Sequence, residues 1–185
     1  MLFQSDRLDE SVRVMRRLLD GERFDHEGPI YPMHDALAAP RPVQPHLPIM
    51  IGGSGPKKTL RTLARYGDMW NAHGTPDELR EKDRHLRQRF AELGRDPESV
   101  ERTVSVDMII RDTRAAALDV YRTIAAGSGQ DFDDSAPYMG SPGEIADSLW
   151  PTIELGFRHL IIDLPAPYDE ETLDRFGEVL ERLNA

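Results

Sequence analysis

A glycine-rich turn is the feature of this sequence with the clearest chemical use. Three glycines and a serine follow a short apolar run at residues 47–51 and precede an apolar helical pattern at residues 56–67. Glycine lets a backbone approach an anion closely because no Cβ stands in the way, and free N–H groups at a helix N-terminus hold phosphate. A tight turn between a strand and a helix also favours glycine for steric reasons alone. Both interpretations, a phosphate-binding turn and a plain turn, stay open for Gly52, Gly53, Ser54 and Gly55.

The residues around this turn exclude three familiar glycine motifs. A P-loop needs glycine before its Lys-[Ser/Thr] pair, but Lys57 stands before Lys58 and Thr59. A dinucleotide fingerprint has the pattern Gly-x-Gly-x-x-Gly. Gly53 and Gly55 fit its first two glycines, but the third is missing at the required spacing. A nucleophile elbow would need glycine where Pro56 stands. Ser54 is therefore not predicted to be a nucleophile, and the sequence assigns no catalytic base.

Four more side chains stand where two predicted strands end. Trp70 and Asn71 end one apolar run, His73 follows directly, and Asp163 lies near the end of another. Barrel enzymes place ligand-facing side chains at the carboxyl ends of their strands. Each residue also has a structural interpretation: Trp70 as a core or interface filler, His73 as a loop residue without a role, and Asp163 as a solvent-facing cap. Trp70 and Asn71 are candidates for a cofactor cleft, and His73 and Asp163 for substrate contacts.

Metal and nucleic-acid chemistry have little support in the composition. The chain has no cysteine, and its other histidines lack metal-ligand spacing, so no metal site is predicted. The 23 Lys and Arg against 33 Asp and Glu give a net charge of −10, which repels phosphate backbones and anionic lipid surfaces. No apolar stretch reaches the roughly 18 residues of a membrane span, and no apolar leader follows the N-terminus. A cytoplasmic protein is expected.

Helices and strands alternate along the predicted chain. Two segments have the cap-Pro-x-Glu pattern of a capping box, one starting at Thr75 and one at Ser141. Five prolines and a glycine suggest that residues 22–46 form a long irregular loop, and long loops are often functional. The expected strands are residues 47–51, 68–72, 103–110 and 159–164; the expected helices are residues 6–19, 56–66, 75–93, 113–126, 141–155 and 173–183.

This order predicts an α/β fold with a parallel sheet. The four strands are apolar throughout, and a helix joins each strand to the next, which requires parallel pairing. Short strands that end in glycine-rich or polar turns favour a (β/α) barrel. A complete barrel takes about 250 residues and eight strands. We therefore predict a single domain over residues 1–185 that forms a partial TIM-type (β/α) barrel, with about four parallel strands and flanking helices.

Two linked motifs in the sequence resemble the luciferase-like monooxygenase family, especially its deazaflavin (F420)-dependent oxidoreductases. The first is the run PIMIGGSG at residues 48–55, and the second is ARYGDMWN at residues 64–71. The turn GRDP at residues 94–97 and the segment GSPGEIA at residues 140–146 are similar to family landmarks in the same order. The resemblance extends from about residue 6 to residue 183.

This resemblance implies a barrel that binds F420, or FMN in other members, at the carboxyl ends of its strands and transfers a hydride to or from the ring. The glycine turn, defined here as residues 52–55, would hold the cofactor phosphate with its backbone. Trp70 and Asn71 would lie near the cofactor or substrate cleft. The protein would bind and orient the cofactor, and the cofactor would carry the chemistry.

The family has four further strands before the part that this chain resembles. The chain matches the C-terminal half of such a barrel, from the fourth helix through the eighth strand and helix. It would therefore be a piece that needs a missing N-terminal half, or a half-barrel that pairs into a homodimer. Two alternatives to an oxidoreductase stay open: a non-catalytic half-barrel for binding or dimerisation, and another phosphate-binding barrel. A small-molecule substrate is expected in the first case.

Overall fold

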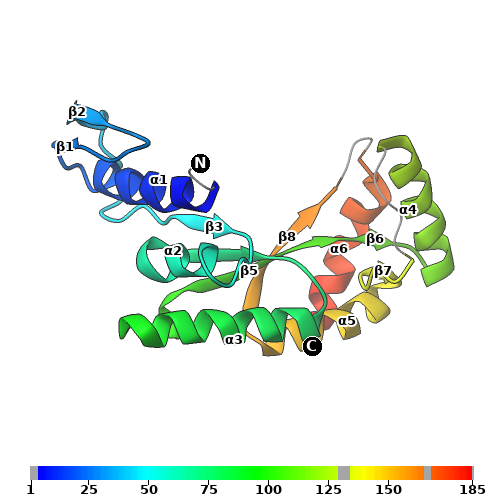
Figure 1. The fold of residues 1–185 in the computed structure, drawn as a ribbon. Helices are drawn as coiled ribbons and strands as arrows, with labels where there is room; N and C mark the ends of the chain where they lie inside the picture. Colours follow the sequence, from blue (N-terminus) through cyan, green and yellow to red (C-terminus); the bar gives the residue numbers. More distant parts are fainter. Residues whose placement is uncertain (1–3, 129–133, 165–167, 185) are drawn as a thin grey trace. The chain divides into compact units, whose positions relative to one another are not determined.

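The computed structural model describes residues 4–128, 134–164 and 168–184 (Figure 1). Helices and strands alternate along most of the chain, as predicted. The helices are α1 (Gln4–Leu19), α2 (Thr59–Tyr66), α3 (Pro76–Leu93), α4 (Arg114–Ser128), α5 (Pro142–Glu154) and α6 (Glu170–Leu183), with a short 3-10 turn at Pro97–Ser99. The strands are β1 (Phe24–His26), β2 (Met33–Ala36), β3 (Met50–Gly52), β4 (Met69–Ala72), β5 (Glu101–Asp107), β6 (Ile109–Ile110), β7 (Met139–Gly140) and β8 (Phe157–Asp163).

The predicted α/β fold class is confirmed. Strands β3, β4, β5 and β8 form a four-stranded sheet in that order, and helices flank it. Strands β3 and β4 pair in parallel, with Ile51 opposite Trp70 and Gly52 opposite Asn71. Strand β5 leads into β6, which pairs in parallel with β7 in a separate two-stranded sheet.

The contacts of the chain divide into two compact units. The first is Met1–Ala72 with Arg80–Arg102, and the second is His73–Leu79 with Thr103–Ala185. In the first unit, α2 and α3 bury leucine and phenylalanine side chains such as Leu60, Leu63 and Phe90. In the second unit, one apolar cluster forms where α4 meets β6 and β7, and it includes Ile109 and Tyr121. The single-domain organisation stays a prediction.

The two capping boxes form as the sequence indicates. The Ser141 hydroxyl accepts a hydrogen bond from the Glu144 N–H at 3.3 Å, and the Glu144 carboxylate accepts one from the Ser141 N–H at 2.8 Å. At the start of α3, the Glu78 carboxylate accepts from the Thr75 N–H at 2.9 Å. These reciprocal bonds satisfy N–H groups that a helix start would otherwise leave without partners, so they fix where each helix begins.

The predicted irregular loop at residues 22–46 is wrong in part. Strands β1 and β2 within it pair antiparallel as a short hairpin. The prolines lie outside both strands, so none of them removes a hydrogen-bond donor from the pair. The hairpin is tied to α1 by Glu10, whose carboxylate accepts hydrogen bonds from the N–H groups of Ile30 at 3.1 Å and Tyr31 at 2.8 Å.

Two other predicted boundaries are also corrected. Helix α2 begins at Thr59, with Lys58 as its N-cap, so Pro56 is in a turn before the helix and not at its first position. The single strand predicted at 103–110 is two strands, β5 and β6, which are separated by Met108 and belong to different sheets. A continuous apolar run cannot show this change of partner, because both strands are buried.

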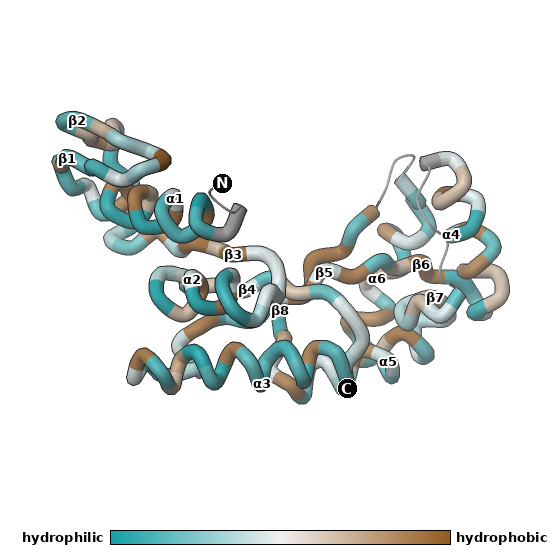
Figure 2. Tube along the Cα trace, viewed as in Figure 1, coloured by the Kyte–Doolittle hydropathy of each residue, from teal (hydrophilic) through white to brown (hydrophobic). Residues whose placement is uncertain are grey.

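Hydropathy along the chain agrees with this arrangement. Figure 2 shows α3 as a mainly hydrophilic helix interrupted by hydrophobic residues. Leu79, Leu86 and Phe90 on this helix are fully buried, while the residues between them are mostly exposed. Within the described ranges, none of the helices is both long enough and apolar enough to cross a membrane.

Candidate functional site

Strand β4 holds the glycine turn through both polar backbone atoms of Gly53. The Gly53 N–H donates a hydrogen bond to the Asn71 carbonyl at 3.1 Å. The Gly53 carbonyl accepts one from the indole N–H of Trp70 at 3.0 Å. Gly53 has a φ of +100°, which is unfavourable for residues with a side chain. The two predicted motifs, around residues 52–55 and 64–71, therefore form one structural unit, in which the second motif fixes the conformation of the first.

The two sides of β3 and β4 have different environments. Ile51 and its partner Trp70 are buried, whereas the next pair along the strands, Gly52 and Asn71, is exposed or half-buried. A Cβ built on Gly52 would meet no protein atom within 4 Å. Protein packing therefore does not require glycine at position 52, and the open space lets a ligand approach the backbone there.

Ser54 supplies a hydrogen-bonding group inside the turn. Its hydroxyl oxygen is buried and has no hydrogen-bond partner among the described residues. A buried hydroxyl without a partner is unusual and points to a group that is missing from the protein alone. An accessible glycine backbone beside an unpaired hydroxyl fits a phosphate group, which accepts hydrogen bonds from both.

The helix contribution to this site differs from the prediction. Because α2 begins at Thr59, three residues separate the glycine turn from its first helical residue. Those residues include Lys57 and Lys58, which bring positive charge next to the turn. The Lys58 ammonium also pairs with Asp6 at 2.9 Å. Backbone N–H groups, a hydroxyl and nearby lysines would thus provide the anion-binding chemistry in place of a helix N-terminus immediately after the turn.

The structure gives Trp70 a supporting position. Its side chain is fully buried, and its indole N–H bonds to Gly53 within the protein. Asn71 is half-buried, and its carbonyl also holds Gly53. Both residues are therefore brought to the turn, while direct contact of either side chain with a cofactor stays a prediction.

Asp68, inside the second motif, anchors the start of β3. Its carboxylate accepts a hydrogen bond from the Ile49 N–H at 2.8 Å and lies 2.8 Å from the His46 ring nitrogen Nε2. Arg16 from α1 lies 3.4 Å from the same carboxylate. Asp68 belongs to the ARYGDMWN motif, but no role was predicted for it from the sequence. Its position explains why an acidic residue follows Gly67: it ties the segment before β3 to the segment before β4.

A second site is a pocket of about 470 Å³ in the second unit. Its lining includes His73 after β4, Asp107 at the end of β5, and Tyr121 and Tyr138. His73, a predicted substrate residue, therefore lines the same pocket as Asp107, which was not predicted as a site residue. Asp107 lies inside the run at residues 103–110 that was predicted as one buried strand, so no signal in the sequence indicated that β5 ends there and that its carboxylate lines a pocket.

Asp163, the other predicted substrate residue, acts on this pocket without lining it. It ends β8, and it is exposed. Partial removal of water around Asp107 raises the pKa of that carboxyl, and the negative charge of Asp163 raises it further. The two predicted substrate residues are thus both associated with Asp107, one through the shared pocket and the other through its charge.

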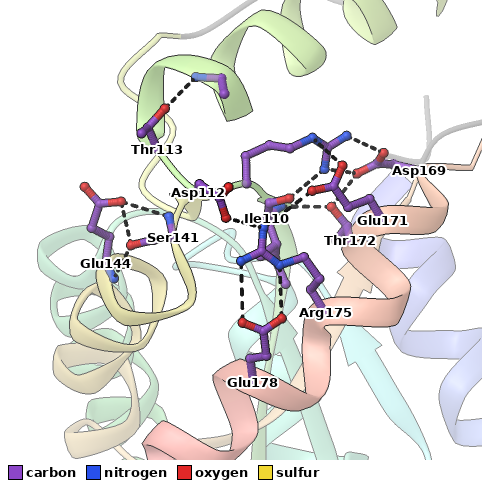
Figure 3. Close-up of polar contacts among 12 residues, drawn as sticks. Ile110, Asp112, Thr113, Ser141, Glu144, Asp169, Glu171, Thr172, Arg175 and Glu178 are labelled. Atoms are coloured by element: carbon purple, nitrogen blue, oxygen red, sulfur yellow. Dashed lines mark hydrogen bonds and ion pairs between the residues drawn. The ribbon is translucent and has the colours of Figure 1, made fainter.

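A polar network at the start of α6 fixes the segment beyond β6 (Figure 3). The Arg111 guanidinium donates to both oxygens of the Asp169 carboxylate, at 2.6 and 3.0 Å, and the Ile110 N–H donates to the Thr172 hydroxyl at 2.9 Å. Burial alone would raise the pKa of Asp169, but the hydrogen bonds from Arg111 and Thr172 bring it below its usual range. Every charge here has a partner, so the network is structural.

Metal ligation has no candidate cluster in the part of the chain that the structure describes. No three His, Asp or Glu side chains gather there in positions that could hold a metal ion. The predicted absence of a metal site stays a prediction for the chain as a whole.

Comparison with known proteins gives the same family as the motifs. The sequence model of the luciferase-like monooxygenase family matches residues 3–155. An F420-dependent glucose-6-phosphate dehydrogenase from Kineococcus radiotolerans is 26% identical over 197 residues, covering 92% of this chain and 58% of that protein. An uncharacterized protein from Mycobacterium tuberculosis is 29% identical over 135 residues, covering 71% of this chain and 47% of its own length. The chain spans about half the length of the curated relatives it matches.

Solved structures show the same fold. An F420-dependent secondary alcohol dehydrogenase in complex with an F420-acetone adduct matches with a TM-score of 0.81 at 20% identity, covering 97% of this chain and 62% of that one. A long-chain alkane monooxygenase matches with a TM-score of 0.71 at 15% identity, covering 100% of this chain and 57% of that one. Because the family match covers most of the sequence, the chain belongs to the luciferase-like monooxygenase family.

Proposed function

We propose that this chain is part of an oxidoreductase that binds F420 through the glycine turn and transfers a hydride between the deazaflavin and a small molecule. FMN is the alternative cofactor. The proposal is supported by family membership and by relatives named for F420-dependent reactions. Solved proteins of the same fold include one bound to an F420 adduct and one bound to modified FMN.

The observation that carries this proposal is the construction of the glycine turn. Trp70 and Asn71 hold the two polar backbone atoms of Gly53, the space over Gly52 is open, and the Ser54 hydroxyl lacks a partner among the described residues. A plain turn would need neither the open space nor an unpaired buried hydroxyl. The arrangement suits a cofactor phosphate that accepts hydrogen bonds from the backbone and from Ser54.

In this proposal the bound cofactor supplies the hydride chemistry, and the chain binds and orients it. The Ser54 hydroxyl and the turn backbone would fix the phosphate. Lys57 and Lys58 would balance part of its charge. Trp70 would keep the turn rigid and so limit the freedom of the bound phosphate.

We further propose that a complete ring pocket needs strands that this chain does not itself provide. The chain covers 57–64% of each of several matched solved proteins. A second copy of the chain, forming a homodimer, or a further N-terminal segment would provide them. A non-catalytic binding module is the result expected if neither completes the pocket.

Fluorescence titration with F420 tests the proposed function. Purified chain is added to F420, and FMN is then added as a competitor, while light scattering gives the mass of the complex. Saturable F420 binding that FMN displaces weakly supports an F420 enzyme, and the reverse order of affinity supports FMN. Failure of the chain to bind either cofactor, as monomer or dimer, contradicts cofactor binding by this chain alone or by its homodimer, and makes the site depend on a further N-terminal segment.

A further inference from the structure

A second binding site lies in the second unit, in the pocket that contains Asp107. We define the Asp107 pocket by six of its lining residues: His73, Glu78, Ser105, Asp107, Tyr121 and Tyr138. Its volume of about 470 Å³ is in the range of small-molecule sites. Tyr121 and Tyr138 are buried, so the pocket has firm walls made by side chains that the fold itself holds in place.

The described lining of the Asp107 pocket contains acidic side chains but no lysine or arginine. Asp107 and Glu78 contribute carboxylates, and none of the described lining residues is a lysine or an arginine. Glu78 is committed to the capping box at the start of α3, which leaves its charge in place but fixes its orientation. A phosphate or carboxylate ligand would therefore meet repulsion that no lysine or arginine among the described lining residues compensates.

We propose that the Asp107 pocket binds a small organic ammonium compound, with Asp107 as its charged anchor and the two tyrosines as its walls. Aromatic rings and carboxylates are the groups that hold ammonium ions in proteins. The hydroxyl of Ser105 and the ring of His73 add polar contacts for the rest of the molecule.

The environment of Asp107 supports this choice of ligand. Its carboxyl loses part of its surrounding water and faces the charge of Asp163, and both effects raise its pKa. A bound ammonium would offset both effects, because it supplies a positive charge beside Asp107, where none of the described lining residues is a lysine or an arginine. No three metal-ligating side chains gather in the described residues, which favours an organic cation over a metal ion.

The inference rests on this pocket alone. If the proposed oxidoreductase activity also holds, it identifies the substrate as an amine. It differs from the relative named for glucose 6-phosphate, because that substrate is an anion and this pocket is acidic. Binding at the pocket can be measured without F420 or FMN, so failure here and failure of the proposed function are separate results.

The test compares three ligands of similar size and different charge: benzylamine, benzyl alcohol and benzoate. Each is titrated at pH 7.5 into the isotope-labelled chain, and amide chemical shifts are followed by NMR. We expect saturable shifts at residues 73–75 and 105–107, with benzylamine binding at least about fivefold more tightly than benzyl alcohol and benzoate binding most weakly.

Two variants assign the preference to Asp107. Asp107→Asn removes the charge at the end of β5, and Asp147→Asn makes the same change at an exposed position on α5 outside the pocket. Asp107→Asn is expected to lower the affinity for benzylamine by about fivefold or more and to change the affinity for benzyl alcohol by less than about twofold. Asp147→Asn is expected to change neither of these two affinities.

Three results would overturn the proposal: no binding of benzylamine to the unmodified chain, equal affinity for benzylamine and benzyl alcohol, or an amine preference that survives Asp107→Asn. The first two need no variant, so the test holds even if a substitution disturbs folding.

Discussion

Replacing Trp70 with phenylalanine separates its support of the glycine turn from simple filling of the core. Trp70→Phe keeps an aromatic ring in a fully buried position but removes the N–H that bonds to the Gly53 carbonyl at 3.0 Å. Loss of one partner of a buried hydrogen bond costs about 1–3 kcal/mol. The smaller ring leaves space that costs roughly another 1–2 kcal/mol. The free energy of unfolding should therefore fall by about 2–5 kcal/mol.

The second tryptophan provides a matched control. Trp150 on α5 is 42% exposed, so Trp150→Phe should change the free energy of unfolding by no more than about 0.5 kcal/mol. Urea unfolding followed by far-UV circular dichroism gives both values from the midpoint and the slope. Each variant keeps one tryptophan, so fluorescence reports unfolding around the residue that remains.

Equal stability of the two variants would refute this reasoning. A loss below about 0.5 kcal/mol in Trp70→Phe would show that the indole N–H does not hold the turn. At temperatures where Trp70→Phe stays folded, its affinity for F420 should also be weaker than that of the parent chain, because Gly53 is less firmly fixed.

Three other substitutions test charges and caps in the second unit. Asp107→Asn should stabilise the chain at pH 7 by about 0.5 kcal/mol, after allowance for solvent screening, because it removes a partly desolvated charge that Asp163 also repels. The raised pKa of Asp107 means that the parent chain loses stability as pH rises from about 3.8 through the folded-state pKa, and the variant should lack this loss. Ser141→Ala should lower the free energy of unfolding, measured by thermal unfolding, by about 1 kcal/mol. It removes the hydroxyl that caps the N-terminus of α5 by accepting a hydrogen bond from the Glu144 N–H. Asp169→Asn should cost about 2 kcal/mol at pH 7, and the cost should shrink as pH falls below about 3.8, because the pKa of Asp169 is lowered in the folded chain.

Matched controls make these three results decisive. Ser148→Ala on α5 removes a hydroxyl that bonds to a helix carbonyl without capping the helix, so it should cost less than Ser141→Ala. Asp147→Asn should leave stability and its pH dependence unchanged, because that carboxylate is exposed. A destabilising Asp107→Asn, or a cost of Asp169→Asn that does not change with pH, would contradict the assigned interactions.

Local sequence signals predicted the parts of the fold that depend on neighbouring residues. The capping boxes at Thr75 and Ser141 were predicted because cap and glutamate are three residues apart. The strands β4 and β8 were predicted because apolar runs of that length fit buried strands. The start of α2 was misplaced because Pro56 suits both a first helical position and a turn.

Features that depend on contacts between distant segments could not be predicted. The break at Met108 depends on which strands pair with β5 and β6, and the pairing is not encoded in the apolar run itself. Trp70 was a candidate for the cofactor cleft, but the register that buries it with Ile51 arises only when β3 and β4 pair. Asp107 was missed because its pocket is built from the end of β5, parts of α3 and α4, and loops that lie far apart in the sequence.

The central claim is that the glycine turn binds a cofactor phosphate, and substitution of Gly52 tests it most directly. Gly52→Val adds a side chain into space that holds no protein atom within 4 Å, so the fold should tolerate it. Gly127→Val on α4 adds the same side chain at another position without neighbours. In fluorescence titrations with F420, Gly52→Val should lose most of the affinity of the parent chain, while Gly127→Val should keep it. Unchanged F420 affinity in folded Gly52→Val would contradict the account.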